Sequence, residues 1–265
     1  MKFSIITVNY NNKEGLKRTI ESVMRQSFRD FEHIIIDGGS TDGSVDVLQE
    51  YDEHITYWIS EKDNGIYNAM NKGIKKATGE YLNFMNSGDC FYDVNVLSKV
   101  YSYHSDADII VGKDYHYNER KQKGHASIQP PRTTMIHFFM ATLDHQSSFI
   151  KRELFEDSLY DENHRLVSDW IFFTEMIVKE GKHVQFIPDI ICQREEGGLS
   201  EKQREKNRTE IDNYLHQFLP CGVYEDYATL SKIDKTNLYR LFSICEDNRK
   251  RKALTLCIKL IHRLL

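Results

Sequence analysis

The sequence has few of the features that mark a secreted, membrane-spanning or disordered protein. Its five cysteines are scattered and include no Cys-x-x-Cys pair, which argues against a disulfide framework or a zinc knuckle. No apolar run reaches the ~18 residues that a spanning helix needs, and the apolar stretch at the start is too short for a signal peptide. Only 4 prolines occur. We therefore expect a globular, cytoplasmic protein.

The charge is also not what a general nucleic-acid binder would carry. There are 35 basic and 40 acidic side chains, for a formal net charge of -5, whereas nucleic-acid-binding domains are usually basic overall. With 265 residues, 40% of them hydrophobic, the chain is long enough for one large domain or for a domain with an appendage. We expect no nucleic-acid partner.

Alternating apolar segments in the first 115 residues indicate strands separated by helices. Residues 3–8 and 34–36 are rich in β-branched side chains and are typical of buried strands, whereas Leu16, Ile20 and Val23 recur at helical spacing. Because parallel neighbours need a crossover connection, this order predicts an α/β fold with a mainly parallel central sheet flanked by helices. Further strands are expected at 55–59, 81–85 and 109–111, and further helices around Val45 and Leu48, at 66–77 and at 94–100.

Polar clusters follow four of these expected strands. They are Asn9, the loop 37–43, the loop 63–65 and the loop 86–89. Ligands of parallel α/β sheets gather at the carboxyl ends of the strands. The sequence therefore predicts a binding site on this edge of the sheet.

The second half of the chain has a less regular pattern. Residues 115–132 are polar and irregular, so we expect a linker or a mobile loop there. Apolar segments resume at 136–143 and 147–150, a helix is expected at 169–179 and a strand at 184–187. Beyond residue 201 the pattern is mostly helical. We expect a domain over 1–200, divided into halves at 1–115 and 116–200, and a helical C-terminal extension over 201–265.

The polar loops contain neither of the two commonest nucleotide fingerprints. The loop 37–43 is not Gly-x-Gly-x-x-Gly and lacks the Gly-Lys-Ser/Thr ending of a phosphate loop. Asp37, at the end of a strand, can accept hydrogen bonds from a base or a ribose, whereas Ser40, Thr41 and Asp42 are better explained as caps of the next helix. Asp89 could be one oxygen ligand of Mg²⁺ or Mn²⁺, but the segment taken by itself is better explained as a turn in which Asp89 caps the helix expected at 94–100.

Taken together, the four clusters resemble the family 2 glycosyltransferases of the GT-A fold. The motifs are specific because all four occur in the expected order, and the resemblance is strong over 1–115, weaker to about 200 and not evident beyond. They are SIITVNYN at 4–11, DGGSTDGS at 37–44, EKDNGIYNAMNKG at 61–73 and NSGD at 86–89.

The resemblance implies a nucleotide-sugar donor, usually a UDP-sugar, bound across the N-terminal half. Asp37 would hold the base, the segment Thr7, Val8 and Asn9 would line its pocket, Asp63 and Gly65 would lie beside the nucleoside, and Asn86 would also contact the donor. Asp89 would be the last acid of the metal-binding motif. Many members have Asp-Asp where this chain has Gly88-Asp89, so the metal would have fewer protein ligands or take another from the C-terminal half.

The same resemblance assigns the acceptor side to DHQSSF at 144–149 and VSDW at 167–170. Asp169 would be the base that removes the proton of the acceptor hydroxyl, although an acid at the start of a helix is also common without catalysis. For His145, a contact with the diphosphate or acceptor and a hydrogen-bonded core position are equally good interpretations. The glycine-containing segment 197–200 would be a loop that closes over the donor, or an ordinary turn.

The end of the chain predicts a basic amphipathic helix. Leu254, Ile258, Ile261 and Leu265 share one helical face, after the basic run at 249–252. Such a helix fits the anionic inner face of a cell membrane, but it also fits packing on its own domain or on a second subunit in a homodimer.

The resemblance to family 2 glycosyltransferases implies an inverting transferase of the hexosyl or N-acetylhexosaminyl type. It would use a divalent metal, Mn²⁺ or Mg²⁺, and would move a sugar onto a saccharide or lipid-linked acceptor in bacterial surface-polysaccharide assembly. Two alternatives remain, a nucleotidyltransferase and a catalytically inert relative that binds a glycan or a protein partner.

Overall fold

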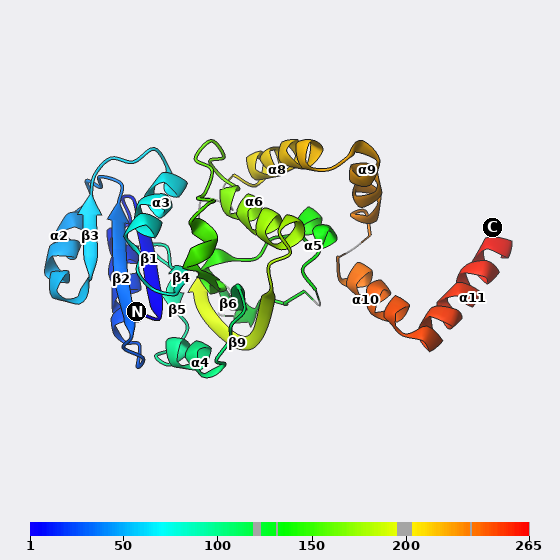
Figure 1. Ribbon diagram of the computed structural model, residues 1–265, viewed down its shortest axis with the longest axis horizontal. Helices are drawn as coiled ribbons and strands as arrows, with labels where there is room; N and C mark the ends of the chain where they lie inside the picture. Colours follow the sequence, from blue (N-terminus) through cyan, green and yellow to red (C-terminus); the bar gives the residue numbers. More distant parts are fainter. Residues whose placement is uncertain (119–122, 131, 195–202, 234, 265) are drawn as a thin grey trace. The chain divides into compact units, whose positions relative to one another are not determined.

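The computed structural model describes residues 1–118, 123–130, 132–194, 203–233 and 235–264. The chain forms two compact units (Figure 1). The first contains residues 1–129 and 142–212, and the second contains 130–141 and 213–265. The division therefore falls within a helix near residue 212, and the segment 130–141 groups with the C-terminal helices.

The first unit is built on one mixed sheet. Its strands lie in the order β3-β2-β1-β4-β8-β6-β9-β5, with β7 paired to β6. Figure 1 shows β3, β2 and β1 side by side. The strands β3, β2, β1 and β4 are parallel to one another. With its helices, the sheet has the α/β class predicted from the sequence. The strands are β1 (Phe3–Asn9), β2 (Phe31–Asp37), β3 (Tyr57–Ser60), β4 (Tyr81–Phe84), β5 (Cys90–Phe91), β6 (Ile109–Asn118), β7 (Lys123–Ala126), β8 (Ser148–Lys151) and β9 (Val184–Arg194).

Helices cover both faces of the parallel strands. The helices α1 (Lys13–Met24) and α2 (Ser44–Glu50) pack on one face, in a cluster that includes Ile20, Ile35 and Leu48. The helix α4 (Val96–Ser102) packs on the same side as α1, in the cluster that contains Ile5. Successive strand residues point to opposite faces, so Ile6 faces away from Ile5 and meets α3 (Ile66–Lys76) on the other side.

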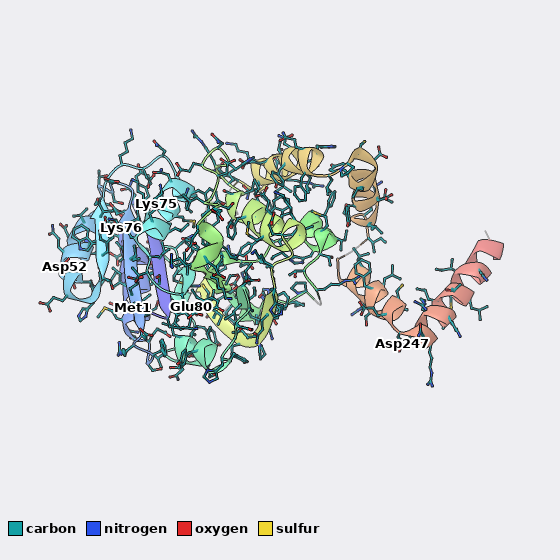
Figure 2. The ribbon with its side chains drawn as sticks, viewed as in Figure 1. Met1, Asp52, Lys75, Lys76, Glu80 and Asp247 are labelled. Carbon is teal, nitrogen blue, oxygen red and sulfur yellow. The ribbon has the colours of Figure 1, made fainter. Side chains whose placement is uncertain are left out.

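A glycine allows α3 to lie close to β1. A Cβ atom added to Gly73 would come within 2.5 Å of Ile6 Cγ2, so only glycine fits without a shift. At its C-terminal end, α3 carries Lys75 and Lys76 (Figure 2), and Lys76 Nζ lies 4.9 Å from the centre of the Tyr57 ring on β3. These contacts fix α3, and with it the loop 63–65, over the ends of β1 and β2.

The prediction of a linker or mobile loop at 115–132 is wrong at 115–118 and at 123–126, which form strands. The strand β6 continues to Asn118 and pairs with β7, with Tyr115 opposite Ala126 and Tyr117 opposite Gly124. The side chains of this hairpin are polar and partly exposed, so they lack the apolar signal of the buried strands. The predicted strand at 184–187 also extends further, because β9 pairs with β6 as far as Arg194.

The strand β8 connects the parallel half of the sheet to the rest. It runs antiparallel to both β4 and β6, and the short helix η2 (His145–Ser147) leads directly into it. The helix α6 (Ser168–Thr174) begins as predicted around residue 169 and continues as the π-helical turn η4 (Glu175–Lys179). The remaining short helices of this unit are η1 (Asp52–His54) and η3 (Arg152–Phe155).

The second unit is helical. Its first segment contributes α5 (Met135–Met140), whose Phe139 ring packs against the rings of Tyr224 and Tyr227. The Asp247 carboxylate accepts hydrogen bonds from the backbone N–H groups of Arg249 and Lys250 and so caps the last helix (Figure 2). The other helices are α8 (Arg204–Phe218), which begins in the first unit, α9 (Cys221–Leu230), α10 (Lys235–Glu246) and α11 (Asn248–Leu264).

None of the helices in the described part of the chain has the length and apolar character needed to cross a bilayer. In α11, Leu254 is half-buried, whereas Leu256 and Ile258 are exposed. The predicted loop at 197–200 and the last apolar residue, Leu265, lie outside the described residues.

Candidate active site

The polar ends of the parallel strands lie side by side at one edge of the sheet. Asn9 is the register partner of Asp37, and Asp37 is the partner of Ser60. The strands β1, β2 and β3 therefore end flush, and their last residues bring three polar side chains together.

Asp37 is completely buried and accepts five hydrogen bonds. Its Oδ1 accepts from Asn9 Nδ2 at 2.7 Å and from the Ser40 hydroxyl at 2.5 Å. Its Oδ2 accepts from the Ser60 hydroxyl and from the backbone N–H groups of Gly39 and Ser40. Burial opposes ionisation, but the donors, led by the Ser40 and Ser60 hydroxyls, hold the pKa of Asp37 below its usual value.

Two of the residues predicted to line the base pocket lie within the sheet. Thr7 has no exposed surface, and its hydroxyl is hydrogen-bonded to His33 Nε2 at 3.0 Å. Val8 is 7% exposed. Burial lowers the pKa of His33 to about 3, so the ring partnering Thr7 is neutral. The accessible part of this edge is instead formed by the loops beyond the strands.

An exposed tyrosine completes this part of the site, and the sequence analysis did not single it out. Tyr10 is 67% exposed. A Cβ atom added to Gly38 would lie 3.2 Å from Tyr10 Cδ2 and 2.5 Å from Asp63 Oδ2, so the Tyr10 ring and the Asp63 carboxylate flank the Gly38 backbone. Asp63 Oδ1 also accepts from the Gly65 N–H at 2.9 Å. The available signal was the aromatic residue directly after the first strand.

Gly65 has a φ of 121°, a conformation that side chains rarely adopt, and it immediately precedes α3. Tyr67 follows in the first turn of α3. Its hydroxyl donates to Asp169 Oδ1 at 2.7 Å. The helix α3 therefore links the loop that contains Asp63 to Asp169.

Asp169 accepts hydrogen bonds at both carboxylate oxygens. While Tyr67 occupies Oδ1, His145 Nδ1 lies 2.7 Å from Oδ2. On the other side of the imidazole ring, Nε2 lies 3.0 Å from Asn86 Nδ2. The structure thus brings together three of the predicted site residues, Asn86, His145 and Asp169, from segments far apart in the sequence.

These contacts keep Asp169 ionised. Burial alone would raise its pKa, but the hydrogen bonds from His145, from the hydroxyl of Tyr67 and from the backbone N–H of Trp170 together lower it. Burial and the nearby Asp169 carboxylate raise the pKa of Tyr67 well above its usual value. Tyr67 is therefore a neutral donor, and Asp169 is a carboxylate that can accept a proton.

Asp89 lies on the same edge, behind a glycine turn. Gly88 has a φ of 104°, and the Thr19 hydroxyl of α1 bonds both the Gly88 N–H and the Asp89 carbonyl. Asp89 Oδ2 accepts from Gln146 Nε2 at 3.0 Å, and Gln146 is the neighbour of His145. Thus the predicted metal ligand and the predicted acceptor motif meet through one side-chain pair.

A partly buried charge cluster lies near Asp89. Arg194 Nη1 is 2.8 Å from Asp144 Oδ1 and 3.9 Å from Asp114 Oδ2. Burial and the neighbouring Asp144 carboxylate raise the pKa of Asp114 to about 9, so Asp114 is protonated at neutral pH. Burial disfavours the charge on Arg194, but the carboxylates of Asp144, Asp114 and Asp89 raise its pKa.

The metal-binding oxygen atoms at this edge suit a divalent cation that is held by both the protein and the substrate. No group of three or more His, Cys, Asp or Glu side chains placed to hold a metal is present among the residues that the structure describes. Asp89 offers carboxylate oxygens, and Mg²⁺ or Mn²⁺ is commonly bound by one or two carboxylates with substrate phosphates and water. The residues fit that arrangement and do not form a cage.

The sequence matches a family model described as Glycosyl transferase family 2 over residues 4–159. The chain belongs to this family. As a family 2 glycosyltransferase it is 44% identical over 97 residues to an uncharacterized glycosyltransferase of Mycobacterium tuberculosis, a match that covers 36% of this chain and 37% of the relative. It is 28% identical over 206 residues to a PGL/p-HBAD biosynthesis glycosyltransferase of Mycobacterium bovis, covering 75% of this chain and 78% of the relative.

Solved structures share the fold of this family 2 glycosyltransferase. Residues 1–349 of TarS of S. aureus, in complex with UDP, give a TM-score of 0.61 at 18% identity, covering 80% of this chain and 64% of that one. The mannosyltransferase PcManGT of Pyrobaculum calidifontis, in complex with GDP-Man and Mn²⁺, gives 0.60 at 14% identity, covering 98% of this chain and 85% of that one. The architecture is the predicted GT-A fold.

Proposed function

We propose that the chain transfers a sugar from a nucleotide-sugar donor, a UDP-sugar, to a hydroxyl of a saccharide or lipid-linked acceptor, with inversion at the anomeric carbon. The observation that carries the proposal is the ionised carboxylate of Asp169, held by Tyr67 and His145 beside the strand ends. A sugar hydroxyl is a poor nucleophile, and a positioned carboxylate can remove its proton as the new bond forms.

The reaction is a single displacement. The acceptor oxygen forms a bond to the anomeric carbon, the bond from that carbon to the β-phosphate oxygen breaks, and the nucleoside diphosphate leaves with the bonding electrons. The proton of the acceptor hydroxyl goes to the free lone pair of an Asp169 oxygen. Because the new bond forms opposite the breaking one, the configuration inverts. A hexosyl or N-acetylhexosaminyl group is the proposed cargo.

On the donor side, the proposed base pocket is formed by Tyr10, the Gly38 backbone and Asp63. The Tyr10 ring is exposed beside Gly38 and offers a stacking surface for a base. Asn9 and Asp37 lie beneath and fix the loop 38–40, so the main chain of this loop is presented to the nucleoside. UDP as the nucleotide is supported by the TarS complexes with UDP and UDP-GlcNAc.

The diphosphate lies, in this proposal, between Asp89 and Arg194. A bound Mn²⁺ or Mg²⁺ at Asp89 would neutralise the charge that develops on the leaving group. Arg194 remains charged near Asp89 and adds positive potential there. The Mn²⁺ in the PcManGT complex supports this choice of metal.

The cellular setting proposed is surface-polysaccharide assembly on the cytoplasmic face of the membrane. The helix α11 carries a basic run at 249–252 and exposes Leu256 and Ile258, a combination that suits an anionic lipid surface. In the alternative proposal, this helix packs against a second copy of the chain.

Calorimetric titration of UDP, first with Mn²⁺ and then with EDTA, tests the donor part of the proposal. Binding that needs the metal supports it. An absence of binding in both conditions, and to other nucleotides, favours an inert relative.

Substitution at Asp169 tests the catalytic part. We expect Asp169→Asn to lower the transfer rate by about 10² to 10⁴ while the affinity for UDP stays the same. Asp106→Asn, which removes an exposed acid elsewhere on the first unit, is the matched control. Transfer by Asp169→Asn at the unsubstituted rate would exclude Asp169 as the base.

A further inference from the structure

The side chain of Asn86 is turned onto His145. Asn86 follows β4, and its Nδ2 lies 3.0 Å from His145 Nε2. Its Oδ1 is buried and accepts no hydrogen bond from any residue in the described ranges. An amide that leaves its carbonyl without a donor in order to serve an imidazole nitrogen is a costly arrangement. The cost points to a role for the contact with His145.

The contacts at the two imidazole nitrogens are different in kind. An amide N–H can only donate, so His145 Nε2 must accept and carry no proton. The Asp169 carboxylate can only accept, so His145 Nδ1 must donate the hydrogen bond of 2.7 Å to Oδ2. A histidine that accepts at Nε2 and donates at Nδ1 is neutral.

We propose that Asn86 is a positioning residue of the transfer reaction, whose amide holds His145 as the neutral tautomer that donates from Nδ1 to Asp169. The inference rests on the proposed function, because it concerns the base of that reaction. The net charge of the Asp169–His145 pair is then -1, and the pair can take up the proton of the acceptor hydroxyl.

The other two states of His145 would each weaken the base. If only Nε2 carried a proton, the lone pair of Nδ1 would face the carboxylate and the hydrogen bond would be lost. If both nitrogens were protonated, the imidazolium would neutralise Asp169 and make it a poorer proton acceptor. The Asn86 amide disfavours both states, because each places an N–H group against the Nδ2 donor.

No other charged group contacts the His145 ring in the described structure. The faces around the ring are supplied by Asn86 at the end of β4, Asp169 on α6 and the edge-on ring of Phe84. The hydroxyls of Tyr67 and Tyr160, near Asp169, are neutral because burial and Asp169 raise the pKa of both. The preceding residue, Asp144, is paired with Arg194.

Asn86→Asp is the decisive substitution, because it keeps the shape and replaces the donor with an acceptor. The new carboxylate would accept from a protonated Nε2 and stabilise an imidazolium between two carboxylates. We expect a fall in kcat of about 100-fold, little change in the affinity for UDP, and an acid limb of the pH–rate profile moved to higher pH.

A spectroscopic signature separates this role from a merely structural one. In protein with ¹⁵N-labelled histidine, the unsubstituted chain at pH 7.5 should show His145 protonated on Nδ1 alone, and Asn86→Asp should show both nitrogens protonated. The signals are assigned by their loss in His145→Gln. Asn95→Asp is the charge-matched control, because the exposed Asn95 uses its Oδ1 to accept from Ser27, which an aspartate can also do.

Two results would overturn the proposal. One is a His145 with both nitrogens protonated in the unsubstituted protein at pH 7.5. The other is an Asn86→Asp variant that folds, as judged by thermal unfolding, and keeps the original tautomer and pH profile. The ¹⁵N spectra can be recorded without catalysis. An absence of transfer from any donor would therefore refute the proposed function, while the spectra would still show which tautomer His145 adopts.

Discussion

Asp37 carries a charge with no exposed surface and with donors at both oxygens. A carboxylate has about four lone-pair sites, and five hydrogen bonds already converge on this one. The geometry supports a role in holding the loop 38–40 in shape, together with the sequence-based prediction that Asp37 matters for the base. If Asp37 holds the loop 38–40, a substitution should lower the free energy of unfolding. If Asp37 only binds the base, the free energy of unfolding should stay the same.

We expect Asp37→Asn to lower the free energy of unfolding by about 2 to 3 kcal/mol, because the new amide would face N–H donors that need an acceptor. UDP should bind more weakly as a consequence. Ser60→Ala, which removes one hydroxyl donor, should cost about 1 kcal/mol. Urea unfolding and calorimetry measure the two effects. A loss of UDP affinity at unchanged stability would identify Asp37 as a direct ligand of the base instead.

Asp114 gives stability a pH dependence with a defined sign. Its pKa is about 9 in the folded protein and about 4 in an unfolded chain. Between these values only the folded protein holds the proton, so the stability that this group contributes is complete below about pH 4 and is lost as the pH rises towards 9.

Asp114→Asn should remove this dependence, because the amide does not ionise. The free energy of unfolding of the unsubstituted protein should fall relative to that of the variant by up to about 1.4 kcal/mol per pH unit. Urea unfolding of both proteins at pH 5.5 and 8.5 checks the slope. Parallel curves would mean that Asp114 is ionised at neutral pH.

At the residue scale, the sequence predicted which residue types form the site better than it predicted where each side chain lies in the fold. The acids and amides at the strand ends are recognisable because few residue types suit such sites, and Asn86, His145 and Asp169 do meet. Tyr10 and Tyr67 were missed, since a tyrosine after a strand or in a helix has many ordinary explanations. Thr7 is buried because both faces of β1 are covered along its whole length, and its polar side chain gave no local sign of this.

At the scale of elements, the close approach of α3 to β1 predicts that a larger side chain at position 73 destabilises the protein. A valine there would drive its Cβ into Ile6, and overpacking of this kind costs about 1 to 3 kcal/mol. We expect Gly73→Val to lose stability in that range and also transfer activity, because Tyr67 lies on the same helix.

Gly222→Val is the matched control for this substitution. A Cβ at Gly222, on α9, meets no atom within 4 Å, so we expect a change within about 0.5 kcal/mol. Thermal unfolding of both variants provides the comparison. Equal stability of the two would show that α3 can move away from β1 without cost.

The elements of the first half were predictable because periodicity is strong where one face is buried. The strand β1 and the helices α1 and α3 were recognised from that signal. The hairpin of β6 and β7 was not, because many of its side chains are polar and partly exposed and so lack an apolar pattern. The antiparallel insertion of β8 between β4 and β6 could not be predicted either, since no local pattern records which strands become neighbours.

At the scale of the whole molecule, the proposed membrane contact can be tested through α11. We expect the full chain to float with vesicles containing anionic lipid and to remain in solution with neutral vesicles, because the basic run at 249–252 needs negative headgroups. A chain ending at Asp247 should stay in solution with both.

A double substitution, Leu256→Ser with Ile258→Ser, tests the apolar contribution in the intact chain. Both side chains are exposed, so folding should be unaffected while flotation decreases. Val223→Ser, at another exposed apolar position, is the control. If the full chain and the shortened chain both stayed in solution, and the full chain formed a dimer, α11 would be a subunit contact.

The hydrogen bond between Tyr67 on α3 and Asp169 on α6 has a consequence for folding during translation. The Tyr67 hydroxyl donates to Asp169 although 102 residues separate the two in the sequence. Asp169 is therefore synthesised seconds after Tyr67. Until β8 arrives, β4 presents an unpaired edge that can pair with another chain. Slowed synthesis between residues 85 and 148 should therefore increase aggregation during translation and the demand for chaperones, even though it changes no contact in the finished enzyme.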